Sequence, residues 1–157
     1  MAEPPAPVAP VQVAAFYRFS AMAELPVLRE ELQQLAEAAG VRGTILLAHE
    51  GVNGTISGPE AGVRQLLARL RCCPGLEPLE AKLSWAPQQP FHRLKVRIKR
   101  EIVTMGCPTV KPAEQVGTYV PPQQWEALIR DPDTLVVDTR NGYEVAIGSF
   151  EIGRAHV

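Results

Sequence analysis

Apolar residues change their spacing several times along the first hundred positions, and each change predicts a secondary-structure element. The run Val13–Phe19 is short, apolar and aromatic, which is typical of a buried strand. After it, apolar residues recur every three or four positions, which predicts one face of a helix that ends near Gly40. The apolar positions of this helix are Leu25, Leu28, Leu32, Leu35 and Ala39.

The next stretch predicts two strands joined by a tight turn, and then a second helix. Thr44–Ala48 and Val52–Ser57 are the strand candidates, and residues 49–51 between them are few enough for a hairpin loop. The helix begins around Pro59, because proline is favoured in a first helical turn, and it must end before Pro74. Its apolar positions are Val63, Leu66, Leu67 and Leu70.

Two further strand candidates, Leu79–Trp85 and Leu94–Val103, complete the pattern of this region. The first six of these seven elements follow the order strand, helix, strand, strand, helix, strand, which is that of a ferredoxin-like split βαβ domain. We therefore expect an α+β fold in which residues 13–103 form a ferredoxin-like domain.

The remaining residues predict a connector and the start of a second domain. Residues 104–120 are rich in proline and glycine, which argues against a continuous regular element. Within residues 121–150, Pro121–Arg130 predicts a short helix with Trp125, Leu128 and Ile129 facing inward. Thr134–Val137 is fully apolar, like a strand buried in a parallel sheet. A segment this short cannot bury a core of its own, so we expect the truncated start of an α/β domain.

Composition narrows the class of protein. Of 157 residues, 46% are hydrophobic and 21% are charged, with a net charge of −1, which fits a globular protein rather than a disordered one. No apolar run is long enough to cross a membrane. Residues 1–12 lack the features of a signal peptide and predict a flexible leader.

The cysteines indicate a reducing compartment and carry no evident chemistry. Cys72, Cys73 and Cys107 are odd in number and lack disulfide or metal-ligand spacing, so we expect a cytoplasmic protein. Cys72 and Cys73 follow the second helix, where partial burial is the simplest interpretation. No haem, flavin or metal motif is present, and we expect no bound cofactor and no metal.

The segment 91–100 (FHRLKVRIKR) carries the strongest physical signal, with five Lys and Arg residues and no acid. Strand alternation places four of the five, at positions 93, 95, 97 and 99, on one face and Leu94, Val96 and Ile98 on the other. Like charges in a row repel one another, and RNA phosphate is a suitable partner, with Phe91 available for stacking. The alternative is a solvated face, partly paired with Glu50, Glu80 or Glu101. The residues predicted to bind RNA are His92, Arg93, Lys95, Arg97 and Lys99.

Asn53 is a second candidate for contact with RNA. It precedes Gly54 near the predicted hairpin, where its side chain could bind a base edge or a ribose. The alternative is ordinary turn chemistry. His49 and Glu50 lie close by, but without a nucleophile or an orienting group they do not make an acid–base site.

Four stretches of the chain carry long and distinctive motifs: GTILLAHEGVNGTISG (43–58), FHRLKVRIKREIVTMG (91–106), VGTYVPPQQW (116–125) and LVVDTRNGYEVAIGSF (135–150). They resemble the bacterial tRNA uridine hydroxylases, a family with a rhodanese domain that forms 5-hydroxyuridine at position 34, the wobble position. The resemblance extends from Phe16 to Phe150. It implies a ferredoxin-like domain before a rhodanese domain, tRNA as partner, and molecular oxygen as co-substrate of the whole enzyme.

The sequence also departs from that family. The family's catalytic cysteine lies in a downstream Cys-Thr-Gly-Gly-type loop that is absent here, so no residue is predicted to be catalytic and the chain alone is expected to be inactive. Asp138, Arg140 and Glu144 are expected to brace the loops around that cysteine. Residues 151–157 are expected to be a non-native tail, since 152–157 (IGRAHV) match one frame of a sequencing adapter. A sulfurtransferase and a non-catalytic RNA-binding module are the alternative functions.

Overall fold

The computed structural model describes residues 9–104, 106 and 117–149. The chain divides into two compact units, Met1–Gln115 and Val116–Val157, and the division falls inside the predicted connector. Most of that connector, together with Cys107 and the predicted tail, lies outside the described residues, as do residues 1–8 of the predicted leader. The end of that leader belongs to the first strand, which begins at Val11 rather than at Val13.

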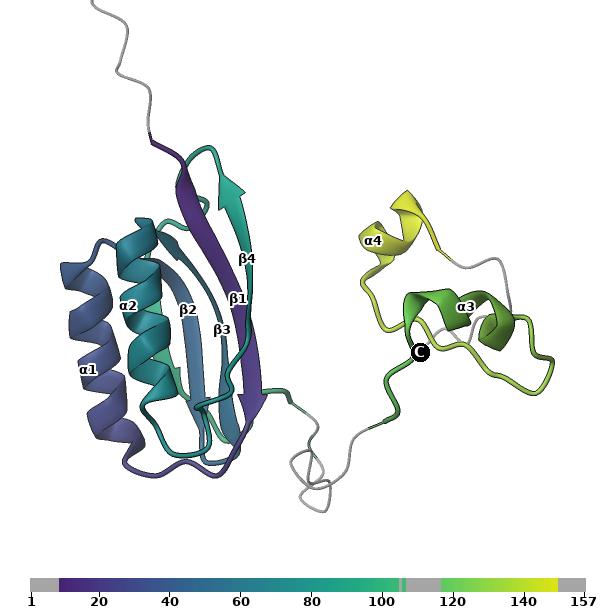
Figure 1. Cartoon of the computed structure of the whole chain (residues 1–157), viewed down its shortest axis with the longest axis horizontal. Coiled ribbons are helices and arrows are strands. Elements are labelled where there is room, and N and C mark those ends of the chain that lie inside the picture. The colour runs from purple at the N-terminus through teal and green to yellow at the C-terminus, as the bar shows by residue number, and fades with distance from the viewer. Residues whose placement is uncertain (1–8, 105, 107–116, 150–157) are drawn as a thin grey trace, which may run out of the picture. The chain divides into compact units, whose positions relative to one another are not determined.

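The N-terminal unit has the predicted α+β, ferredoxin-like fold (Figure 1). Each helix and strand in this region was anticipated by the hydrophobic pattern, with ends that differ by a few residues. The elements are β1 (Val11–Phe19), α1 (Leu25–Ala38), β2 (Arg42–Ala48), β3 (Gly51–Gly58), α2 (Glu60–Arg71), β4 (Ala81–Ala86) and β5 (Leu94–Ile98).

The five strands form one sheet in the order β4-β1-β3-β2-β5. All neighbouring strands are antiparallel except β5, which runs parallel to β2 at the edge. The prediction that a strand continues to Val103 was wrong, because β5 ends at Ile98. One further bond, from the Lys99 N–H to the Leu47 carbonyl at 2.8 Å, follows it. Beyond that point β2 turns into the hairpin, so the chain after Lys99 has no strand to pair with.

Helices α1 and α2 lie on the same face of the sheet, where the core is (Figure 1). Their apolar stripes meet the apolar side of β2 and β3, and each fully buried side chain contributes roughly 1.5–3 kcal/mol to folding. Gly43 permits a close approach of these two strands, since a Cβ there would lie 2.2 Å from the Thr55 carbonyl oxygen. The core includes Leu25, Leu32, Ile45, Leu47, Ile56, Leu66 and Leu70.

No helix among the described residues of this unit covers the other side of the sheet, which we call the open face. The chain between β4 and β5 passes from one edge of the sheet to the other. Gln89, in the middle of this link, accepts a hydrogen bond from the Ser57 hydroxyl and donates one to the Ser57 carbonyl at 3.2 Å. Ser57 belongs to the open face, so the link crosses that face at its Ser57 end.

The described part of the C-terminal unit contains α3 (Pro122–Ile129) and α4 (Gly142–Ile147). Helix α3 was predicted, but its inward-facing side was not confirmed, because no residue of α3 is buried. The strand predicted at Thr134–Val137 was wrong: these residues form no strand, and Leu135 is 72% exposed. A parallel strand needs a neighbour to hydrogen-bond with, and residues 117–149 supply none.

None of the helices in the described part of the chain is both long enough and apolar enough to span a membrane.

Candidate nucleic-acid interface

The basic strand β5 presents its two sides differently, as strand alternation predicted. Val96 lies opposite Ile45 and is only 4% exposed, so it belongs to the core. Lys95 and Arg97 lie opposite Thr44 and Leu46, which places both on the open face. Ile98 also lies on the predicted side, opposite Leu47, but it is 42% exposed because it is the last residue of an edge strand.

The strand register connects Lys95 of β5 with a lysine at the opposite edge of the sheet. One row of facing residues runs Lys82, Ala15, Thr55, Thr44 and Lys95, with one residue from each strand. The row therefore begins and ends with a lysine.

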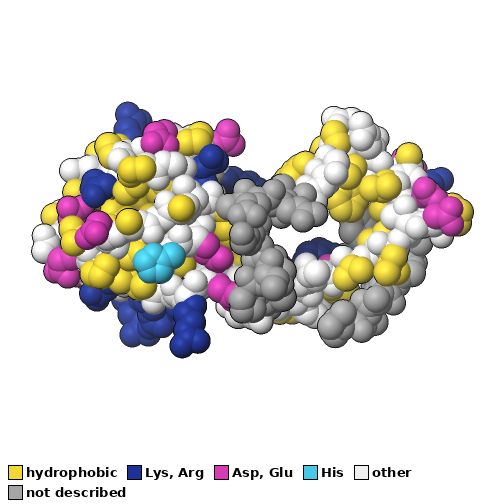
Figure 2. Space-filling model, turned by 90° about the horizontal axis from the view of Figure 1, so that it is seen from below, with side chains coloured by type: hydrophobic (Ala, Val, Ile, Leu, Met, Phe, Trp, Pro, Cys, Tyr) yellow, Lys and Arg dark blue, Asp and Glu magenta, His cyan; other side chains and the backbone are white. Residues whose placement is uncertain are grey.

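A second row of the open face, made of Tyr17, Asn53, Leu46 and Arg97, begins with an exposed aromatic ring. None of the strand residues on the open face is acidic, although Glu80 lies just before β4. Figure 2 shows Lys and Arg side chains gathered along the lower margin of the N-terminal unit.

A small hollow lies in the middle of the open face. Its volume is about 220 Å³, and Phe91 forms one wall while β2 and β3 form the floor. Drug-sized ligands occupy sites of about 300–1,000 Å³, so this hollow has room for one small planar group rather than a larger ligand. The floor residues are Thr44, Leu46, Asn53, Gly54 and Thr55.

The chain that follows β5 is fixed to the sheet through Ile102, an arrangement we call the Ile102 clamp. The Ile102 N–H donates to Glu50 Oε1 at 2.6 Å, and Asn53 Nδ2 donates to the Ile102 carbonyl at 3.2 Å. Ile102 itself is 3% exposed. Part of the hydrogen-bonding capacity of Asn53 is therefore used within the fold, and Glu50 binds the backbone rather than a basic side chain.

The predicted RNA-binding cations have no acidic partner in the described part of the chain. Arg93, Lys95, Arg97 and Lys99 make no ion pair there, and neither Glu50 nor Glu80 reaches them. Glu101 accepts a hydrogen bond from the Gly106 N–H at 3.2 Å. His92, next to Phe91, is exposed. The geometry thus leaves these cations able to meet an external anion.

In the C-terminal unit, the three residues predicted to act as braces hold their own loop. Arg140 forms a two-point ion pair with Asp138, at 3.0 and 2.8 Å, and also donates to the Gly148 carbonyl at 3.0 Å. The hydrogen bonds that Arg140 donates to the Asp138 carboxylate raise the pKa of the guanidinium above its ordinary value. Glu144 accepts from the Asn141 N–H at 3.0 Å, closing a capping box at the start of α4.

The cysteines within the described residues are not arranged for catalysis. Cys72 is exposed and Cys73 is half-buried, with Arg69 Nη1 donating to Cys73 Sγ at 3.3 Å. Arg69 also pairs with Glu31, and hydrogen bonding to that carboxylate raises the pKa of the guanidinium. No group of three or more possible ligands among the described residues could hold a metal ion.

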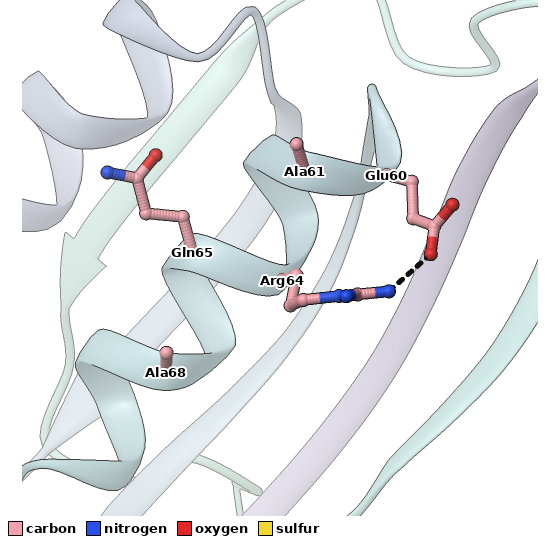
Figure 3. A pocket seen from close by; sticks show the side chains of 5 residues that line it. All are labelled: Glu60, Ala61, Arg64, Gln65 and Ala68. Atoms are coloured by element: carbon pink, nitrogen blue, oxygen red, sulfur yellow. Dashed lines mark hydrogen bonds and ion pairs between the residues drawn. The ribbon is translucent and has the colours of Figure 1, made fainter.

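A larger hollow, of about 500 Å³, offers no comparable chemistry. It lies on the outer surface of α2, where Arg64 and Glu60 form an ion pair at 2.5 Å (Figure 3). Its lining residues all come from this one helix, so no second element encloses a ligand. They are Glu60, Ala61, Arg64, Gln65 and Ala68.

Tyr17 and Lys82 were not among the residues predicted to bind RNA. Both lie in predicted strands, and alternation alone could have placed each on one of two sides. Joining them to Arg97 and Lys95 requires the strand order, which the hydrophobic pattern does not contain.

The fold and this face define an α+β domain with a basic sheet surface that no helix of its described residues covers, and comparisons with known proteins place the domain in a family. Residues 11–102 match the family described as the UPF0176 acylphosphatase like domain. The chain belongs to that family. Solved structures similar to it include an acylphosphatase from Coxiella burnetii, at 15% identity and a TM-score of 0.41, covering 57% of this chain and 94% of that one.

Curated relatives carry the name tRNA uridine(34) hydroxylase. The protein from Rhizobium leguminosarum is 55% identical over 141 residues, which are 90% of this chain and 46% of the relative. That from Synechococcus sp. is 56% identical over 148 residues, covering 90% of this chain and 48% of the relative. That from Gluconobacter oxydans is 50% identical, covering 90% and 45%. The chain thus spans just under half the length of these relatives.

Proposed function

We propose that this chain is the N-terminal part of a tRNA-modifying oxygenase that hydroxylates uridine 34 to 5-hydroxyuridine, with molecular oxygen as co-substrate. The names and similarity of the relatives support the reaction. The enzyme would act in the cytoplasm, where tRNA is found. In this proposal the ferredoxin-like domain binds tRNA, and the reacting thiol belongs to the rhodanese domain of the full-length enzyme.

The observation that carries the role of this domain is the open face of the sheet. It displays Lys82, Lys95 and Arg97 without an acidic strand residue between them. Phosphate contacts made by Lys and Arg supply most of the sequence-independent affinity of proteins for nucleic acid. Arg93, Lys99 and His92 extend the same basic edge beyond the two ends of β5.

In the C-terminal unit we assign Asp138, Arg140 and Glu144 a bracing role. Several of their contacts lie within their own loop. Arg140 forms an ion pair with Asp138 and donates to the Gly148 carbonyl, and Glu144 caps Asn141. Such contacts fix the backbone around a loop without using any group that reacts. In the full-length enzyme, these loops would border the catalytic thiol.

The reaction is tested with the full-length protein and tRNA isolated from a strain that lacks its gene. Under labelled molecular oxygen, we expect uridine 34 to gain one labelled oxygen atom, as read by mass spectrometry of the digested tRNA. Replacement of an oxygen by sulfur would instead identify a sulfurtransferase, and an unchanged nucleoside would leave only RNA binding.

The role of the domain is tested by Arg97→Gln in the same full-length protein, with Arg64→Gln on α2 as the matched control. Each phosphate contact contributes roughly 0.7–0.9 to the slope of log affinity against log salt. We expect Arg97→Gln to weaken tRNA binding and lower the slope by about one such step, while Arg64→Gln changes neither. Equal behaviour of the two variants would show that β5 does not contact tRNA.

A further inference from the structure

Resting on the proposed function, we propose that the open face binds an unpaired stretch of RNA rather than a duplex. One base stacks on Tyr17, a second planar group enters the hollow beside Phe91, and Lys82, Lys95 and Arg97 bind the phosphates between and around them.

Tyr17 is the first observation behind this proposal. It lies on β1, an interior strand, yet its side chain is 62% exposed. Its facing neighbour on β3 is Asn53, and the preceding residue on the same face is the small Ala15, so neither covers the ring. A tyrosine ring that stands open on a sheet surface is the kind of platform on which single-stranded bases stack.

The second observation is the spacing of the groups along one row of the sheet. Tyr17 and Arg97 are separated by β3 and β2, which is three strand spacings or about 14 Å. That distance is spanned by a few nucleotides of an extended single strand. The hollow beside Phe91 lies over β2 and β3, between the aromatic and the basic end of the row.

The third observation concerns the chain segments on either side of a strip of the open face. This strip consists of the two rows described above, one running from Lys82 to Lys95 and the other from Tyr17 to Arg97. The link between β4 and β5 crosses the open face at Ser57, where Gln89 ties it down. On the side away from Ser57, Asn53 of the second row donates to the Ile102 carbonyl, so the Ile102 clamp limits the strip there. The strip between the link and the clamp is two rows of residues wide, which suits a single strand and its flat bases. A duplex is wider and keeps its bases stacked inside, so it would meet the lysines but not Tyr17.

Charge and backbone pairing favour RNA over a peptide as the occupant. The strand residues of the strip carry positive charge and no acid. The strands that carry Tyr17 and the hollow, β1, β3 and β2, are paired on both sides, so a peptide could add a strand only at β4 or β5 and not over this part of the face. The face instead presents an aromatic ring on which a base can stack and basic side chains that can bind phosphate, which are the features of an RNA-binding surface.

The proposal is tested with the 157-residue chain and two fluorescent probes, an unstructured RNA of about eight nucleotides and a blunt RNA duplex of matching composition. Tyr17→Ala should weaken single-strand binding about 5- to 150-fold, since stacking on an aromatic side chain is worth roughly 1–3 kcal/mol per base. Tyr17→Phe, which keeps the ring, should bind like the parent chain. Tyr119→Ala, at an exposed tyrosine of the other unit, is the matched control.

Salt dependence separates the two kinds of contact. Tyr17→Ala should lower affinity without changing the salt slope, whereas Arg97→Gln should lower both. Equal affinity for the two probes, or unaltered single-strand binding by Tyr17→Ala, would overturn the proposal. If the full-length protein fails to hydroxylate tRNA while Tyr17→Ala still loses single-strand affinity, the proposed function fails and the RNA surface stands.

Discussion

At the scale of single residues, two neighbours in β5 have different roles, because one side chain is buried in the core and the next lies on the open face. Val96 fills the core beneath α1, and Arg29 of that helix donates a hydrogen bond to the Val96 carbonyl at 3.3 Å. Arg97, the next residue, points to the opposite side and has no acidic partner in the described part of the chain. Val96 therefore contributes to the stability of the fold, whereas Arg97 is available for the proposed contact with RNA.

This division predicts a contrast between two substitutions. Val96→Ala should lower the free energy of unfolding by about 1–3 kcal/mol, because it removes buried methyl groups and leaves a cavity. Arg97→Gln should change it by no more than about 0.5 kcal/mol, as is usual for an exposed side chain. Urea unfolding of both variants measures the difference. A large loss of stability in Arg97→Gln would mean that its guanidinium has a structural partner.

At the scale of elements, the Ile102 clamp joins the end of the basic strand to the β2–β3 hairpin. Glu50 lies in the turn of that hairpin and Asn53 lies near the start of β3. Together they bind the N–H and the carbonyl of one residue. The position of the chain after β5 is thus set by side chains as well as by strand pairing.

The clamp predicts a difference between Glu50→Ala and Glu50→Gln. Removal of the acceptor leaves a buried N–H without a partner, which costs about 1–3 kcal/mol. We expect the Ile102 amide of Glu50→Ala to exchange with solvent much faster than in the parent chain, as measured by NMR. Glu50→Gln keeps an oxygen that can accept the bond, so most of the protection should remain. Equal loss in both variants would show that the carboxylate charge is what matters.

Features that depend on the spacing of nearby residues could be predicted from the sequence. Features that depend on pairing with residues far along the chain could not. The apolar spacing of Leu25 to Leu35 specifies a helix by itself, and alternation placed Val96 and Arg97 on opposite sides. The candidate site is different, because Tyr17 and Arg97 share a row only through the pairing of four strands. The strand predicted at Thr134–Val137 failed for the same reason: an apolar run becomes a strand only beside another strand.

At the scale of the whole molecule, the two units differ in how much they bury. The N-terminal unit has a continuous core, whereas neither α3 nor α4 has a buried residue in the described part of the chain. Burial of apolar surface is the main term that opposes the loss of chain entropy on folding. The stability of this chain therefore resides in the ferredoxin-like unit.

Native-state hydrogen exchange tests this distribution. Amides of Leu94–Ile98 that bond to β2 should be protected close to the limit set by global unfolding, because the strand opens only when the sheet does. Amides of Leu135–Val137 should exchange far faster, since no strand pairs with them in the described residues. Equal protection of the two segments would contradict this and indicate a second cooperative unit.

The interior position of β1 has a consequence for synthesis on the ribosome. β1 is made first, yet it lies between β3 and β4, and Val11 pairs with Ala86, which is made much later. Because domains fold as they emerge, α1 and the β2–β3 hairpin are available long before β4 completes the sheet around β1. β5 joins last, against β2. A nascent chain that stalls before Leu94 would thus expose the unpaired edge of β2, a template for aggregation with other chains.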